Sequence, residues 1–190
     1  WGALEDVALA EARRQFEVNV FGLMRLTQQV LPSMRAARAG TIVNVSSMGG
    51  RIWTPAGGWY YATKHALEVL SDVLRVETRP FGIHVVVVQP GRIRSDWSAI
   101  AARSLRASAA RSAYAAQMDA MARLLESYAG AARPEVVAEA VARALADARP
   151  RRRYAVPAEA RAMILARRLL PDGAWERLVQ ASIRAAGREK

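Results

Sequence analysis

A nearly continuous apolar segment, residues 83–88, is the strongest constraint on the fold of this chain. Only His84 interrupts a series of isoleucine and valine residues. A strand that is apolar on both sides is typical of a parallel sheet covered by helices on both faces. The segment ends at Gln89-Pro90-Gly91, which is a strong turn signal. A second β-branched segment, residues 41–47, predicts another buried strand.

Amphipathic helices are expected before each of these strands. Residues 9–38 carry apolar side chains at three- and four-residue steps, and Gly40 is expected to end this helix. A second helix is predicted over residues 59–78, where Pro80 and Gly82 follow. The order helix, strand, helix, strand predicts right-handed crossovers in an α/β sheet.

The rest of the chain is expected to be mainly helical. Residues 97–128 are rich in Ala and Arg and predict helix, Gly130 breaks the pattern, and Pro134 begins a helix that runs to residue 148. Residues 154–156 predict a last short strand, with helices after it on both sides of residues 171–173. We therefore divide the chain into a main domain, residues 1–150, and a helical extension, residues 151–190, that packs on it.

Composition excludes several classes of protein. The chain of 190 residues has no cysteine and two histidines, so disulfides and a cysteine- or histidine-based zinc site are not expected, and no metal is predicted. No apolar run approaches about 18 residues, the minimum for a membrane span. The net charge of +11 comes from arginines scattered over helices, which argues against a nucleic-acid-binding protein and leaves weak contact with an acidic membrane surface open. We expect a cytoplasmic protein, with targeting signals left open because the chain begins with Trp1.

Lys64 is the only lysine apart from Lys190, and it follows Tyr60 by four residues. Side chains at positions i and i+4 lie on one face of a helix, so the ammonium is expected beside the phenol. A neighbouring cation favours the phenolate and would lower the pKa of Tyr60 towards neutrality, which suits a proton donor and acceptor. On its own, this spacing is more typical of an exposed helical lysine beside an aromatic ring.

Polar residues also follow both predicted strands. Ser46 and Ser47 end the first, and Pro90 and Gly91 follow the second. Ligands of open α/β sheets bind beyond the carboxyl ends of the strands, and the helix that carries Tyr60 connects these two strands. The hydroxyl, the phenol and the ammonium are therefore expected to meet at one edge of the sheet.

These motifs together resemble the short-chain dehydrogenase/reductase family, in particular its branch of 17β-hydroxysteroid and retinol dehydrogenases. The similarity extends over about residues 4–148 and rests on four motifs in order: Val18-Asn19-Val20-Phe21-Gly22, Asn44-Val45-Ser46-Ser47-Met48-Gly49-Gly50, Tyr60 to Lys64, and Pro90-Gly91-Arg92-Ile93-Arg94-Ser95. The resemblance implies a doubly wound Rossmann-like parallel sheet. It also implies that residues 1–150 are the C-terminal part of the catalytic domain, with the Gly-rich N-terminal half missing from this chain.

The resemblance assigns roles to single residues. Tyr60 would be the general acid/base, Lys64 would hold its phenolate and the nicotinamide ribose, and Ser47 would orient the substrate oxygen. Asn19 would interrupt the first helix and fix a water that relays protons to Lys64, in keeping with the low helix propensity of asparagine. Tyr61 and Ser46 are geometric alternatives to Tyr60 and Ser47, and the family register selects the latter pair.

The implied cofactor is NAD or NADP, and the resemblance leaves the choice between them open. Pro90, Gly91, Ile93 and Ser95 would lie along the nicotinamide, with Ser95 where the family more often has threonine. The nearby Trp53, Trp59 and Trp97 suit either an apolar substrate pocket or core packing.

Three functions are compatible with these observations. The first is an oxidoreductase acting on a hydrophobic alcohol or ketone, inactive as this chain alone without the missing half. The second is a truncated, non-catalytic relative that serves as an oligomerisation or binding module. The third is association with nucleic acid or acidic membrane through the arginine-rich tail. Because the helices over residues 9–38 and 59–78 commonly form the subunit interface in the family, a homo-oligomer is expected.

Overall fold

Three parallel strands form the sheet in a computed structural model that describes residues 1–110, 112–127 and 131–188. The strands are β1 (Gly40–Val45), β2 (Ile83–Pro90) and β3 (Arg153–Val156), in the order β1-β2-β3. Gly40 pairs with Ile83 at one end of the sheet and Pro90 pairs with Val156 at the other. The central position of β2 explains its apolar sequence, because Val85, Val86, Val87 and Val88 are at most 2% exposed.

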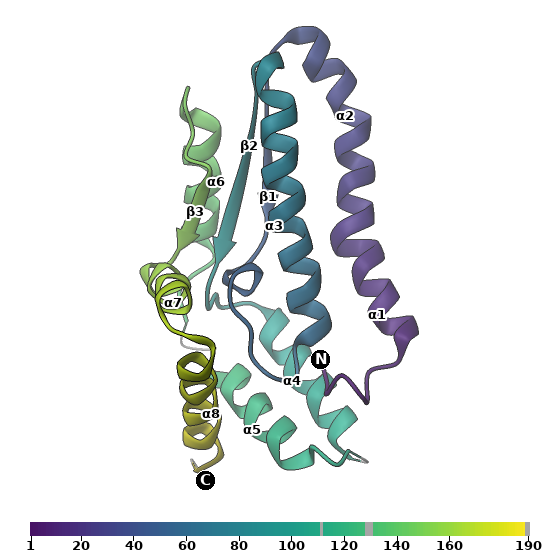
Figure 1. Ribbon diagram of the computed structural model, residues 1–190, viewed down its shortest axis with the longest axis vertical. Coiled ribbons are helices and arrows are strands. Elements are labelled where there is room, and N and C mark those ends of the chain that lie inside the picture. Colours follow the sequence, from purple (N-terminus) through teal and green to yellow (C-terminus); the bar gives the residue numbers. More distant parts are fainter. Residues whose placement is uncertain (111, 128–130, 189–190) are drawn as a thin grey trace.

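Helices cover both faces of this sheet, as the apolar strands predict. The helix α3 (Gly58–Thr78) packs against β2, and α2 (Leu23–Ala37) packs against β1. On the other side, α6 (Glu135–Ala146) contacts all three strands. Figure 1 shows α2 and α3 running side by side along one side of the sheet, with α6 on the other side. The α/β fold with a parallel sheet is confirmed.

The first long helix extends over the expected residues but is not uniform. It consists of α1 (Leu9–Phe16), a π-helical turn η1 (Glu17–Gly22) and α2. Gly40 does not end it, as the sequence suggested, because Arg38 already takes the left-handed conformation at φ 51° and Gly40 is the first residue of β1. The left-handed residue that ends the helix is thus two positions earlier than predicted.

A short 3₁₀ turn, η3 (Arg79–Phe81), and Gly82 end α3 as predicted. Gly82 has φ 72°, and a Cβ at this position would lie 2.4 Å from the carbonyl oxygen of Arg38. A side chain is therefore excluded where the loops before β1 and β2 meet.

Residues 97–128, predicted as one helical stretch, contain two helices, α4 (Asp96–Ala109) and α5 (Ala115–Glu126). The predicted end at Tyr128 and break at Gly130 lie outside the described residues.

The C-terminal part of the chain contains α7 (Ala158–Leu169) and α8 (Asp172–Arg188), and α8 packs against α5. Residues 151–190 are thus more than a helical extension, because β3 is a strand of the sheet. Among the described helices, none has the length and apolar character required to cross a bilayer.

Candidate active site

A cavity of about 1220 Å³ lies where β1 and β2 end, and we call it the sheet-edge cavity. Parallel strands bring their carboxyl ends to the same edge, which is why segments distant in sequence meet there. The eight residues singled out from the sequence all line it: Asn19, Ser47, Tyr60, Lys64, Pro90, Gly91, Ile93 and Ser95.

Ser47 follows β1 in an extended conformation and begins the short 3₁₀ turn η2 (Met48–Gly50). Its hydroxyl accepts a hydrogen bond of 3.0 Å from the backbone N–H of Gly49, which fixes the side chain. The same hydroxyl donates a hydrogen bond of 3.5 Å to the carbonyl oxygen of Pro90, and it lies near enough to the phenol to lower the pKa of Tyr60 through hydrogen bonding. Two hydroxyl groups from different elements thus face one point of the cavity.

Tyr60 lies in the first turn of α3, beneath two tryptophans. The centre of its ring is 5.7 Å from that of Trp1 and 5.4 Å from that of Trp97. Burial raises the pKa of the Tyr60 phenol above its usual value, and the hydrogen bond with Ser47 offsets only part of this effect. The expectation of a lowered pKa is therefore wrong, and the phenol keeps its proton at neutral pH.

Lys64 lies on the same face of α3, with Nζ 5.9 Å from the centre of the Tyr60 ring. The ammonium donates a 3.1 Å hydrogen bond to the carbonyl oxygen of Val45 at the end of β1. This hydrogen bond directs the ammonium towards the sheet. The positive charge of Lys64 therefore does not outweigh the effect of burial on the pKa of Tyr60. Burial also lowers the pKa of Lys64, and the carboxylate of Glu68 raises it in part.

Asn19 lies in the π-helical turn η1, so the expected interruption of the first helix is present. Its amide donates to Thr63 Oγ1 at 3.2 Å, and that hydroxyl donates to the carbonyl oxygen of Tyr60 at 2.7 Å. Asn19 is therefore connected to the backbone of Tyr60 through Thr63. The water relay from Asn19 to Lys64 stays a prediction.

Thr63 is a site residue that the sequence analysis missed. Its side chain is fully buried and joins η1 to α3. A polar residue on the buried face of an amphipathic helix was the available signal, since buried hydroxyls need partners.

The two geometric alternatives, Tyr61 and Ser46, also line the cavity but differ in their contacts. The Tyr61 hydroxyl is hydrogen-bonded to Thr54 Oγ1 at 2.7 Å, and its ring lies against Gly49 and Gly57. Ser46 is 4% exposed, and its hydroxyl has no hydrogen-bond partner among the described atoms. Ser47 and Tyr60 differ from both alternatives, because the Ser47 hydroxyl lowers the pKa of the Tyr60 phenol through hydrogen bonding.

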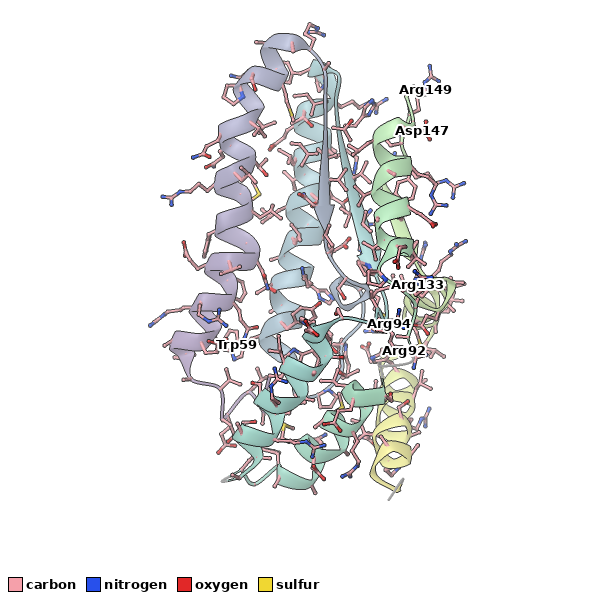
Figure 2. All side chains as sticks on the ribbon, turned by 180° about the vertical axis from the view of Figure 1, so that it is seen from behind. Trp59, Arg92, Arg94, Arg133, Asp147 and Arg149 are labelled. Atoms are coloured by element: carbon pink, nitrogen blue, oxygen red, sulfur yellow. The ribbon has the colours of Figure 1, made fainter. Side chains whose placement is uncertain are left out.

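The loop after β2 is held by the C-terminal part of the chain. The backbone N–H of Gly91 donates to the carbonyl oxygen of Val156 at 2.8 Å, and Arg92 forms an ion pair of 2.6 Å with Glu159 of α7. The N–H of Arg94 donates to the carbonyl oxygen of Ala132 at 2.9 Å. Figure 2 shows Arg92, Arg94 and Arg133 close to one another where β2 ends. Glu159 gave no signal in the sequence, since its partner lies 67 residues earlier.

Apolar side chains from α4, α5 and α8 form one wall of the cavity. Trp175 of α8 is fully buried and donates from Nε1 to the carbonyl oxygen of Trp53 at 3.2 Å. The other large apolar side chains of these three helices that line the cavity are Trp97, Ile100, Met121, Leu124, Leu125, Leu178, Val179 and Ile183. Trp97 thus lies at this wall, whereas Trp53 contacts Trp175 from outside the lining and Trp59 packs against Phe16.

Comparison with known proteins agrees with this arrangement. The family model described as short chain dehydrogenase matches residues 2–106, which contain Asn19, Ser47, Tyr60, Lys64 and the loop after β2. The chain belongs to the short-chain dehydrogenase family.

Individual family members extend this result to the C-terminal part. An uncharacterized oxidoreductase of Escherichia coli, YbbO, is 34% identical over 184 residues, which are 95% of this chain and 63% of YbbO. The 3-ketodihydrosphingosine reductase of Bacteroides thetaiotaomicron is 46% identical over 97 residues, which are 51% of this chain and 36% of that enzyme.

Among solved structures, a short-chain dehydrogenase from Streptomyces avermitilis superposes with a TM-score of 0.75 at 30% identity, covering 99% of this chain and 66% of that one. The likeness therefore includes β3, α7 and α8, beyond the residues that the family model matches. The chain spans between about a third and two thirds of the length of these relatives.

Proposed function

We propose that this dehydrogenase chain carries the catalytic side of an NAD- or NADP-dependent oxidoreductase that interconverts an alcohol and a carbonyl. The observation that supports this most strongly is the convergence of Ser47, Tyr60 and Lys64 on one cavity, with the Lys64 ammonium 5.9 Å from the centre of the Tyr60 ring. A substrate oxygen bound between Ser47 and Tyr60 would meet two hydroxyl groups at once.

Tyr60 is the general acid of carbonyl reduction. Its O–H bond breaks as the proton moves to the substrate oxygen, and the reverse transfer makes it the base of alcohol oxidation. Its raised pKa keeps the proton in place before substrate binds. Ser47 donates a hydrogen bond to the same oxygen, and Lys64 supplies the positive charge beside the phenolate that forms. Asn19 acts through Thr63 as a positioning residue.

The polar wall of the sheet-edge cavity suits the nicotinamide and ribose part of NAD(P). Ser95, Lys64 and Tyr60 offer hydroxyl and ammonium groups to a ribose and an amide, and the volume of about 1220 Å³ accommodates both this part and a substrate. When bound, the reduced nicotinamide supplies the hydride that adds to the carbonyl carbon. The choice between NAD and NADP stays open.

The substrate is a hydrophobic alcohol or ketone. The wall formed by α4, α5 and α8 is apolar, and burial of an apolar substrate there contributes about 25 cal/mol per Å² removed from water. The similarity to the 3-ketodihydrosphingosine reductase of Bacteroides thetaiotaomicron is consistent with this substrate class.

Steady-state assays of the full-length protein test the proposal. With NADH or NADPH and a series of ketones of increasing apolar size, we expect consumption of the reduced cofactor with formation of an equal amount of alcohol. Consumption that does not depend on any ketone, or none with either cofactor, would refute the oxidoreductase function and favour the non-catalytic alternative.

We further propose that the chain forms a homo-oligomer through η1, α2 and α3. Val69, Val73 and Val76 follow one another at helical spacing on α3 and are between 48% and 73% exposed. Val18 and Phe21 of η1 are 62% and 58% exposed, and η1 packs beside α3. Neighbouring exposed apolar residues of this kind mark an interaction surface. The partner that we propose for it is the same surface on a second copy of the chain.

Replacing Val73 with arginine should shift this oligomer towards monomer, because a second copy would bury the added charge. Sedimentation velocity gives the mass directly. Leu145→Arg, at a 58% exposed position of α6, is the matched control and should leave the mass unchanged. A wild-type protein that sediments as a monomer would refute the proposed interface. The non-catalytic alternative also predicts an oligomer, so only the ketone assay distinguishes it from the oxidoreductase function.

A further inference from the structure

A second cavity of about 710 Å³ lies along the outer strand β3, on the side of the sheet away from β1, and includes adjacent parts of α6 and α7. No described residue lines both this cavity and the sheet-edge cavity. Four arginines define it, and we call it the arginine cavity: Arg143, Arg151, Arg153 and Arg161.

Three of these guanidinium groups have no ion-pair partner within the described part of the chain. They belong to Arg143 of α6, to Arg151 before β3 and to Arg161 of α7. Asp147 is the one acidic residue among the described lining residues, and one of its oxygens accepts a 2.8 Å hydrogen bond from the N–H of Arg149. Figure 2 shows Asp147 and Arg149 together where α6 ends. Three unpaired guanidinium groups and one carboxylate leave a net charge of +2 in the cavity.

The fourth arginine is fixed in place. Arg153 donates to Glu68 at 2.9 Å and to Asp72 at 2.6 Å, so its charge is compensated and its side chain is ordered. Gln89, which also lines the cavity, donates to the same Glu68 at 2.9 Å. This wall is therefore preorganised, which lowers the entropy that a ligand loses on binding.

The remaining lining is aromatic and aliphatic. Tyr154 presents its ring and accepts a 3.2 Å hydrogen bond from the N–H of Arg151 through its hydroxyl, while Val156 and Ile164 are apolar. Such a mixture of a charged group and apolar walls is typical of a small-molecule pocket, for which volumes of about 300 to 1000 Å³ are usual.

We propose that the arginine cavity binds a small molecule that carries a diphosphate group. Guanidinium groups bind phosphate oxygens in a bidentate manner and keep their charge at every physiological pH. Unpaired guanidinium groups on three separate segments can contact two adjacent phosphates together, whereas a monophosphate offers fewer oxygens to share among them. The cavity is a binding site separate from the oxidoreductase site, and its occupation does not depend on that activity.

Calorimetric titration of the purified protein with inorganic pyrophosphate tests this site. We expect saturable 1:1 binding that weakens as salt is added, and an affinity for orthophosphate at least about tenfold lower. Arg143→Ala and Arg161→Ala should each weaken pyrophosphate binding about tenfold, because each removes charge-assisted hydrogen bonds. Both side chains are exposed, so these variants should keep the thermal stability of the wild type.

Two control variants locate the binding. Arg168→Ala removes an exposed arginine from the same helix as Arg161 but outside the cavity, and it should leave the affinity unchanged. Lys64→Met removes a cation from the sheet-edge cavity and should also leave it unchanged. Absence of pyrophosphate binding, wild-type affinity in both Arg143→Ala and Arg161→Ala, or loss of binding in Lys64→Met would each overturn the proposal.

Discussion

Replacing Tyr60 with phenylalanine should lower kcat of the full-length enzyme by about 10²- to 10⁴-fold, the usual contribution of a general acid or base. The variant loses one hydroxyl and keeps the ring that packs against Trp1 and Trp97, so the cavity retains its shape. Cofactor affinity should change much less than kcat, because Lys64 and the loop after β2 keep their contacts.

Tyr61→Phe is the matched control for this experiment. Tyr61 is the next residue of α3, lines the same cavity and carries the same hydroxyl, but its hydroxyl is bonded to Thr54. It should keep kcat within about a factor of ten, the effect of one neutral hydrogen bond. If Tyr61→Phe loses the activity and Tyr60→Phe keeps it, the assignment of the acid is wrong.

Replacing Glu68 with alanine should give the largest loss of stability among the polar substitutions considered, about 3 kcal/mol in the free energy of unfolding. Glu68 is 1% exposed and accepts hydrogen bonds from Arg51, Gln89 and Arg153 at 3.2, 2.9 and 2.9 Å. Its removal leaves the buried amide of Gln89 without this acceptor. This loss is at the lower end of the range expected when one partner of a buried ion pair is removed, because Asp72 still pairs with both arginines.

Urea denaturation at neutral pH measures this loss. Glu77→Ala, at an exposed position of the same helix, is the matched control and should change the stability by at most about 0.5 kcal/mol. A loss below about 1 kcal/mol in Glu68→Ala would mean that the network around this carboxylate contributes little to the fold.

The elements that could be predicted from sequence are those whose pattern is local. The apolar segment of β2 predicted a strand covered on both faces. Its isoleucine and valine residues are 2% exposed or less, which agrees with this prediction. The asparagine within the first helix indicated an interruption, which is the turn η1. The division of residues 97–128 into α4 and α5 was not visible, because alanine-rich sequence favours helix throughout.

The parts that could not be predicted depend on contacts between distant residues. Glu68 has the sequence context of a surface residue, yet its partners lie 17, 21 and 85 residues away. The direction of the pKa shift of Tyr60 was predicted wrongly from Lys64, four residues along the helix. It is decided by burial beneath Trp1 and Trp97, which come from other parts of the chain.

The most direct test of the central claim is the kcat/KM of Ser47→Ala, Tyr60→Phe and the variant with both changes, compared with the full-length wild type. Ser47 and Tyr60 are proposed to act on one substrate oxygen, and residues that act as a unit have effects that do not multiply. We predict that the double variant is about as slow as Tyr60→Phe alone. Effects that multiply fully in the double variant would contradict the account, because they would mean that the two hydroxyl groups act independently.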